Sequence, residues 1–75
     1  MRFIECTGQT LAQIVNEGEL HADDLEAAGV HPETIVRVNE QGDIEVRRHA
    51  CWDVIGGLLG DFAHRVCEQT GLDWA

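Results

Sequence analysis

Residues 34–49, TIVRVNEQGDIEVRRH, constrain the fold most, because apolar and polar side chains alternate on both sides of a turn sequence. This alternation is typical of a β-hairpin with one buried face. A three-residue loop over 40–42, with Gly42 in the left-handed position, gives the register that keeps the apolar residues together. The expected cross-strand pairs are Val38 with Ile44, Val36 with Val46 and the oppositely charged Arg37 with Glu45.

Three further short elements are predicted in the first half of the chain. Residues 2–6, RFIEC, are rich in β-forming side chains and precede a turn, so we expect a strand. Helix signals follow in residues 10–18, with a capping-box pattern at the start and a glycine at the end. A second short helix is predicted in residues 21–30, with acids in its first turn and Gly29 as its stop.

The segment 50–70 carries apolar residues at helical spacing and is predicted to form one long helix. The three glycines inside it would each cost about 1 kcal/mol relative to alanine. On a helix, Gly56, Gly60 and Ala63 would fall into one stripe of small side chains, which lets another backbone approach closely. The stripe could relieve crowding within the monomer or form the contact between two copies. Gly57 would lie on the polar side and is explained by neither alternative.

The expected fold class is α+β, a single domain over residues 1–75 with the element order β-α-α-β-β-α. A three-stranded antiparallel sheet would be packed by one long C-terminal helix and two short helices. This order resembles that of the eukaryotic-type KH domain, which clamps nucleotides with a GxxG loop between its first two helices. The corresponding loop here, residues 18–21, has one glycine, and an acid where bases are wanted. The resemblance is therefore one of topology and implies no shared function.

The formal net charge is −9, from 14 acidic residues and 5 basic residues that are all arginine. An acidic surface repels phosphate backbones and anionic membranes, so we expect neither direct nucleic-acid binding nor membrane binding. It suits a basic protein partner or imitation of nucleic acid, and it also promotes solubility. Arg37, Arg47 and Arg48 are expected to form a basic cluster on the solvent face of the hairpin, where they could contact an anion or an acidic partner. The use of arginine without lysine favours a bacterial source with a GC-rich genome.

The cysteines indicate a reducing compartment. Cys6, Cys51 and Cys67 are odd in number, widely spaced and without a CxxC motif, so we expect reduced thiols. The sequence contains no apolar run long enough for a signal peptide or a membrane span. We therefore expect a cytoplasmic protein.

Few residues suggest a chemical site. His64 and Cys67 are three apart on the predicted helix and could form half of a metal site or a Cys–His dyad. His49 and Cys51 form a second pair, but it would lie about 20 Å away along a straight helix. The sequence has no serine or tyrosine nucleophile, and the dyad lacks an evident orienting group. No enzymatic activity, bound metal or cofactor is therefore expected.

These observations favour a small acidic protein that acts as a non-enzymatic protein-interaction module and homodimer. A short chain gains stability from a second core, and tryptophan is favoured at interface centres. The alternative is an acidic inhibitor that imitates nucleic acid and occupies the groove of a basic protein. The expected interface residues are Trp52, Gly56, Gly60, Ala63 and Trp74.

Overall fold

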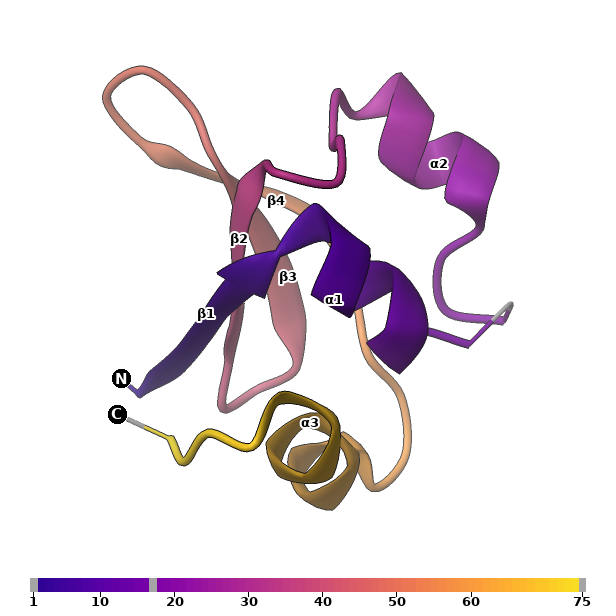
Figure 1. The fold of residues 1–75 in the computed structure, drawn as a ribbon, viewed down its shortest axis with the longest axis vertical. Coiled ribbons are helices and arrows are strands. Elements are labelled where there is room, and N and C mark those ends of the chain that lie inside the picture. The colour runs from indigo at the N-terminus through magenta and orange to yellow at the C-terminus, as the bar shows by residue number, and fades with distance from the viewer. Residues whose placement is uncertain (1, 17, 75) are drawn as a thin grey trace.

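The computed structural model describes residues 2–16 and 18–74 and shows an α+β fold (Figure 1). Four antiparallel strands form one sheet in the spatial order β1-β2-β3-β4, and the helices lie to one side of it. The elements in chain order are β1 (Phe3–Thr7), α1 (Gly8–Ile14), α2 (Ala22–Ala27), β2 (Ile35–Asn39), β3 (Asp43–Arg47), β4 (Trp52–Gly57) and α3 (Phe62–Thr70).

The predicted hairpin is the β2–β3 pair, and its predicted register is confirmed. Gly42 adopts a φ of +90° in the turn. It also has no room for a side chain, because a Cβ atom there would lie 2.9 Å from the ring of Phe62. The turn therefore packs directly against α3. The observed pairs are Val36 with Val46, Arg37 with Glu45 and Val38 with Ile44.

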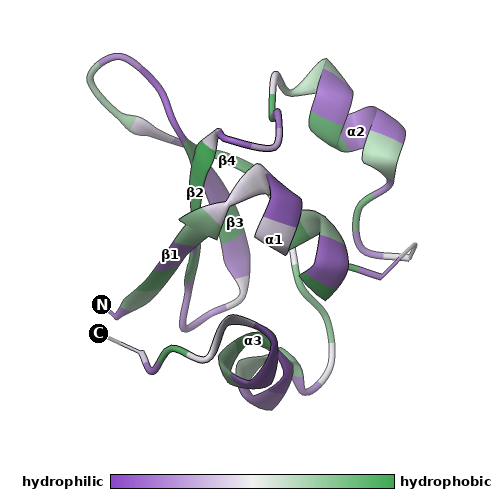
Figure 2. Cartoon of the chain, viewed as in Figure 1, coloured by the Kyte–Doolittle hydropathy of each residue, from purple (hydrophilic) through white to green (hydrophobic). Residues whose placement is uncertain are grey.

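The N-terminal strand pairs within its own chain. β1 runs antiparallel to β2, with Ile4 opposite Val38 and Glu5 opposite Arg37. Both hydrophobic and hydrophilic residues occur along β1 (Figure 2).

The prediction of one long helix over residues 50–70 is wrong, and the sheet has four strands where three were predicted. Residues Trp52–Gly57 form β4, which pairs antiparallel with β3, and helix α3 begins only at Phe62. Apolar spacing was misleading because a short apolar run fits a strand as well as a helix. The β-forming residues before the glycines, and the cost of glycine inside a helix, favour a strand along the edge of β3. The fourth strand also removes the KH-type element order.

Both predicted short helices are present, with altered ends. Thr7 caps α1 by accepting a hydrogen bond from the Thr10 amide at 3.4 Å, so the helix begins earlier than expected. It also ends earlier, at Ile14. Helix α2 ends as predicted. Gly29 has a φ of +78°, and the amide of Val30 donates to the carbonyl of Leu25 at 2.9 Å. Within the described residues, no helix is long and apolar enough to cross a membrane.

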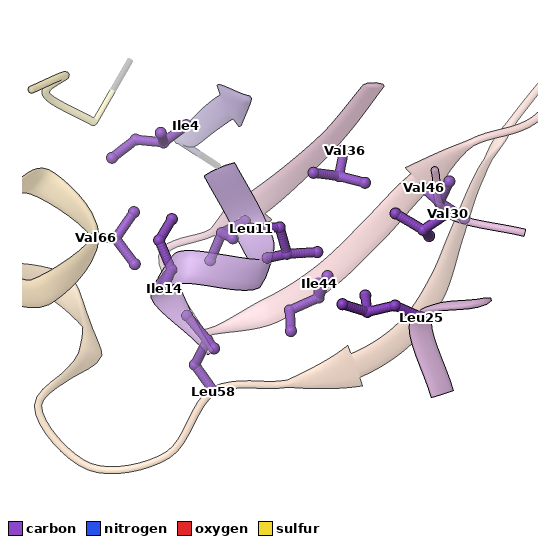
Figure 3. Packing of buried hydrophobic residues seen from close by; sticks show 11 residues of the cluster. Ile4, Leu11, Ile14, Leu25, Val30, Val36, Ile44, Val46, Leu58 and Val66 are labelled. Atoms are coloured by element: carbon purple, nitrogen blue, oxygen red, sulfur yellow. The ribbon is translucent and has the colours of Figure 1, made fainter. Parts of the chain in front are cut away.

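The hydrophobic core fills the space between the inner face of the sheet and the three helices (Figure 3). Each aliphatic side chain buried in this way contributes about 1.5–3 kcal/mol relative to leaving it exposed. The buried cluster consists of Ile4, Leu11, Ile14, Leu25, Val30, Val36, Val38, Ile44, Val46, Leu58 and Val66.

Glu19 connects the α1–α2 linker to the C-terminal part of the chain. Its side chain is only 4% exposed, and Oε2 accepts a hydrogen bond from the guanidinium of Arg65 at 2.7 Å. The same carboxylate accepts hydrogen bonds from the amides of Leu59 and Asn16. Burial acts to raise the pKa of Glu19, but these hydrogen bonds and the charge of Arg65 outweigh burial and lower it.

The C-terminal tail folds back onto the body, with Trp74 packed against the core. The ring of Trp74 meets the ring of Phe62 edge-to-face, with centroids 6.4 Å apart and an interplanar angle of 81°. Leu72 remains exposed, so Trp74 rather than Leu72 attaches the tail.

Candidate interaction surface

The sheet has a second face, opposite the core, which we call the outer face. All three helices contribute buried residues to the core, and in the described part of the chain none of them covers the outer face. The strand pairing assigns its members: Phe3, Glu5 and Thr7 of β1, Ile35, Arg37 and Asn39 of β2, Asp43, Glu45 and Arg47 of β3, and Trp52 and Val54 of β4.

Arg37 occupies the centre of the outer face between two aromatic rings. Its Cζ lies 3.8 Å from the ring centroid of Phe3 and 4.1 Å from that of Trp52. Its Nε and NH2 groups donate to Oε1 of Glu45 at 3.3 Å and 3.0 Å. The guanidinium plane thus stacks on aromatic rings while its edge binds a carboxylate, a combination that lysine cannot reproduce.

Two polar residues beside Arg37 are buried although no helix lies above them. Glu45 is 8% exposed and Asn39 is 5% exposed. The Asn39 amide nitrogen donates to Oδ2 of Asp43 at 3.2 Å and approaches Oε2 of Glu45 at 3.5 Å. Its carbonyl oxygen accepts hydrogen bonds from the amides of Gln41 and Asp43. The centre of the outer face is therefore a connected, largely dry polar network.

Apolar side chains surround this network. Ile35 is 46% exposed and Val54 is 59% exposed, while Phe3 and Trp52 are half-buried. Exposed apolar side chains that gather on one face form a patch, and larger patches of this kind mark sites of protein interaction.

Charges of both signs lie at the margin of the outer face. Arg47 is exposed, and its Cζ lies 5.7 Å from the ring centroid of Trp52. Glu5 is exposed on the same face but on β1, at the opposite edge of the sheet. The margin is thus cationic at one end of the sheet and anionic at the other.

The predicted basic cluster does not form as one group. Arg37 and Arg47 lie on the outer face, but Arg48 turns away from it. The guanidinium of Arg48 donates to the carbonyl of Ala28, at the end of α2, at 2.8 Å and pairs with Asp53 at 3.5 Å. Successive strand residues point to opposite faces, and Arg48 directly follows Arg47 at the end of β3. Arg47 and Arg48 therefore lie on opposite faces of the sheet.

The predicted interface residues are dispersed over the molecule. Trp52 lies on the outer face, whereas Gly56 of the same strand faces inward. Gly60 lies in the loop after β4 with a φ of +68°, and Ala63 is exposed on α3. Trp74 packs against α3 from the tail. The stripe of small residues does not exist, because its members do not share a helix.

The residues considered for metal or thiol chemistry do not converge. His64 is largely exposed and lies 3.5 Å from the carboxylate of Glu68, whereas Cys67 packs against the core. His49 and Cys51 are exposed in the loop between β3 and β4. The described residues hold no group of three or more histidine, cysteine or acidic side chains that could bind a metal ion.

Three apolar members of the outer face, Phe3, Ile35 and Val54, were not identified from the sequence. Ile35 could have been found, because it lies two residues before Arg37 and so points to the same side of the strand. Phe3 and Val54 belong to the two edge strands, and their approach to Arg37 and Glu45 depends on the order of the four strands.

No protein-family model matches this chain, and no match was found among curated proteins or among solved structures.

Proposed function

We propose that this protein is a non-enzymatic interaction module that forms a homodimer through the outer face of its sheet. The observation that carries the proposal is the exposure of Ile35 and Val54 beside the stacked rings of Phe3 and Trp52. Two such faces in contact would bury the apolar side chains that surround the central polar network, between sheets about 10 Å apart.

The charges at the margin favour a second copy of the same chain as the occupant. A two-fold symmetric contact places the same surface on both sides, so a residue at one end of a face can meet the opposite end of its partner. The cationic end carries Arg47 and the anionic end carries Glu5. A face with both signs is complementary to itself when the two copies are arranged in this way.

The size of the chain supports the same occupant. A domain of 75 residues buries only about 60% of the surface that its unfolded chain exposes. Association through a preformed, rigid face would add apolar burial without ordering new segments. The central ion pair is already buried in the monomer, so its desolvation is largely complete before association.

Sedimentation equilibrium of the full chain and of matched charge variants tests this proposal. Val54→Glu and Ile35→Glu each introduce a carboxylate on the outer face. Leu59→Glu is the control, because Leu59 is 67% exposed but lies in the loop between β4 and α3. Circular dichroism confirms that each variant remains folded.

The proposal predicts that the wild type and Leu59→Glu sediment as dimers and that both outer-face variants sediment as monomers. A monomeric wild type over the accessible concentration range contradicts the homodimer. A dimer that persists in both folded outer-face variants shows that association uses another surface.

A further inference from the structure

A groove runs between α1 and α2, on the helical side of the molecule. It consists of two adjoining hollows of about 310 Å³ and about 510 Å³. Ala12 of α1 and Ala22 and Leu25 of α2 line both hollows, which makes the groove continuous. Figure 1 shows α2 at the edge of the fold, beside α1.

The walls of the groove combine aliphatic side chains with polar ones, the latter being Gln9, Gln13, His21 and His31. Val15 and Leu20 line one end and Val30 lines the other, while Leu25 is buried beneath. Each hollow falls within the range of about 300–1,000 Å³ that is usual for ligand sites. Large side chains from another molecule can therefore enter without displacing the core.

Acidic side chains occupy the rim. Asp23 lines the first hollow and Glu26 the second, both exposed on α2. No arginine lines either hollow, and among the described residues neither acid forms an ion pair. Four of the arginines are engaged elsewhere, in the pairs Arg2–Glu40, Arg37–Glu45, Arg48–Asp53 and Arg65–Glu19.

We propose that this groove binds a basic amphipathic α-helix of a partner protein. Aliphatic residues on one face of such a helix would contact the aliphatic parts of the walls, and its lysines or arginines would reach Asp23 and Glu26. A groove between two helices can also receive the side chains that an amphipathic helix presents on one face at every third or fourth residue. The groove lies across the sheet from the outer face, so a homodimer presents two grooves.

A pair of synthetic peptides tests the chemistry of the occupant. The first is a helix of about 18 residues with leucine at helical spacing and lysine elsewhere, a length that sustains helicity in isolation. The second has the same composition in an order without helical periodicity. Fluorescence anisotropy with labelled peptide gives the affinity of each for the full chain, at about 50 mM and about 500 mM salt.

A matched pair of double variants locates the binding site. Asp23→Asn with Glu26→Gln removes the two rim charges. Asp61→Asn with Glu68→Gln removes the same number of charges near α3, outside the groove. Because the net charge changes equally, a difference in affinity between the two variants reports position and not total charge.

We expect the periodic peptide to bind the wild type at least about tenfold more tightly than the non-periodic peptide. The rim variant should weaken that binding about tenfold, and the α3 variant should change it less than about twofold. Absence of binding at low salt overturns the proposal. Equal binding of both peptides, or equal weakening by both variants, also overturns it and indicates diffuse attraction to an acidic surface, as imitation of nucleic acid would require.

Discussion

Arg37 and Trp52 stack on each other across a strand to which neither belongs: the guanidinium carbon of Arg37 on β2 lies 4.1 Å from the ring centroid of Trp52 on β4. Strand β3 runs between them and contributes Glu45, whose carboxylate accepts two hydrogen bonds from Arg37. Phe3 of β1 closes the other side of the guanidinium. One arginine therefore joins side chains from all four strands.

We predict that Arg37→Met lowers the free energy of unfolding by about 2 kcal/mol, because it leaves the carboxylate of Glu45 buried without its cationic partner. The control is Arg2→Met, which breaks the exposed pair with Glu40, with side chains 64% and 41% exposed. We expect a loss below about 0.5 kcal/mol for that change. Urea denaturation measures both, and equal small losses would contradict the stabilising role of Arg37.

Two turn glycines should differ in their tolerance of alanine. Gly42 and Gly60 both have positive φ, so each Ala substitution costs about 1–2 kcal/mol in backbone conformation. A Cβ atom at Gly42 would also lie 2.9 Å from the Phe62 ring and 3.1 Å from the carbonyl oxygen of Leu58, whereas Gly60 has open space around it. We predict a loss of about 3 kcal/mol or more for Gly42→Ala and about 1 kcal/mol for Gly60→Ala. Thermal unfolding checks the order, and a Gly60 variant that is the less stable of the two would refute it.

The stability contributed by Glu19 should depend on pH. Its pKa in the folded protein is lowered from an ordinary value of 4.5, so the folded state favours the ionised carboxylate. The resulting stabilisation is fully present above that ordinary value and disappears as the pH falls through the lowered folded-state pKa. We predict that the stability difference between wild type and Glu19→Gln is constant near neutrality and shrinks in acid below about pH 4.5.

Urea titrations at a series of pH values measure this difference, with Glu33→Gln as the control at an exposed acid. A wild-type advantage over Glu19→Gln that remains unchanged far below the ordinary pKa would show that the hydrogen bonds do not require the ionised form of Glu19.

The cysteines should differ in reactivity although all three are free thiols. Burial raises the pKa of the Cys6 thiol to about 11, which keeps this thiol protonated and unreactive near neutral pH. Cys51 is exposed in the loop before β4. We predict that iodoacetamide modifies Cys51 at least about tenfold faster than Cys6 in the native protein. Peptide mass spectrometry measures the two rates, and urea-denatured protein, in which they should converge, is the control.

The sequence was sufficient where neighbouring segments determine the structure. The β2–β3 register followed from alternation and from the position of Gly42, and the end of α2 followed from Gly29. The same information identified the cross-strand pair of Arg37 with Glu45. These features depend on residues that are close in sequence or joined by a tight turn.

The sequence was insufficient where the structure depends on pairing between distant segments. Residues 50–70, taken alone, carry apolar side chains at helical spacing. Their division into β4 and α3 depends on the hydrogen bonds that the edge of β3 provides. The energetic cost of Gly56 and Gly60 in a helix was a sign against the long helix. The outer face could not be predicted without β4, because Trp52 and Val54 are residues of that strand.

The most direct test of self-association through the outer face is an isotope-filtered NOE experiment on a mixture of ¹³C-labelled and unlabelled protein. It detects contacts between two copies and assigns them to individual side chains. The proposal predicts intermolecular NOEs from the methyl groups of Ile35 and Val54 and from the ring of Trp52. Intermolecular NOEs confined to other surfaces, such as Leu59 or Ala63, or none at concentrations well above those used for sedimentation, would contradict it.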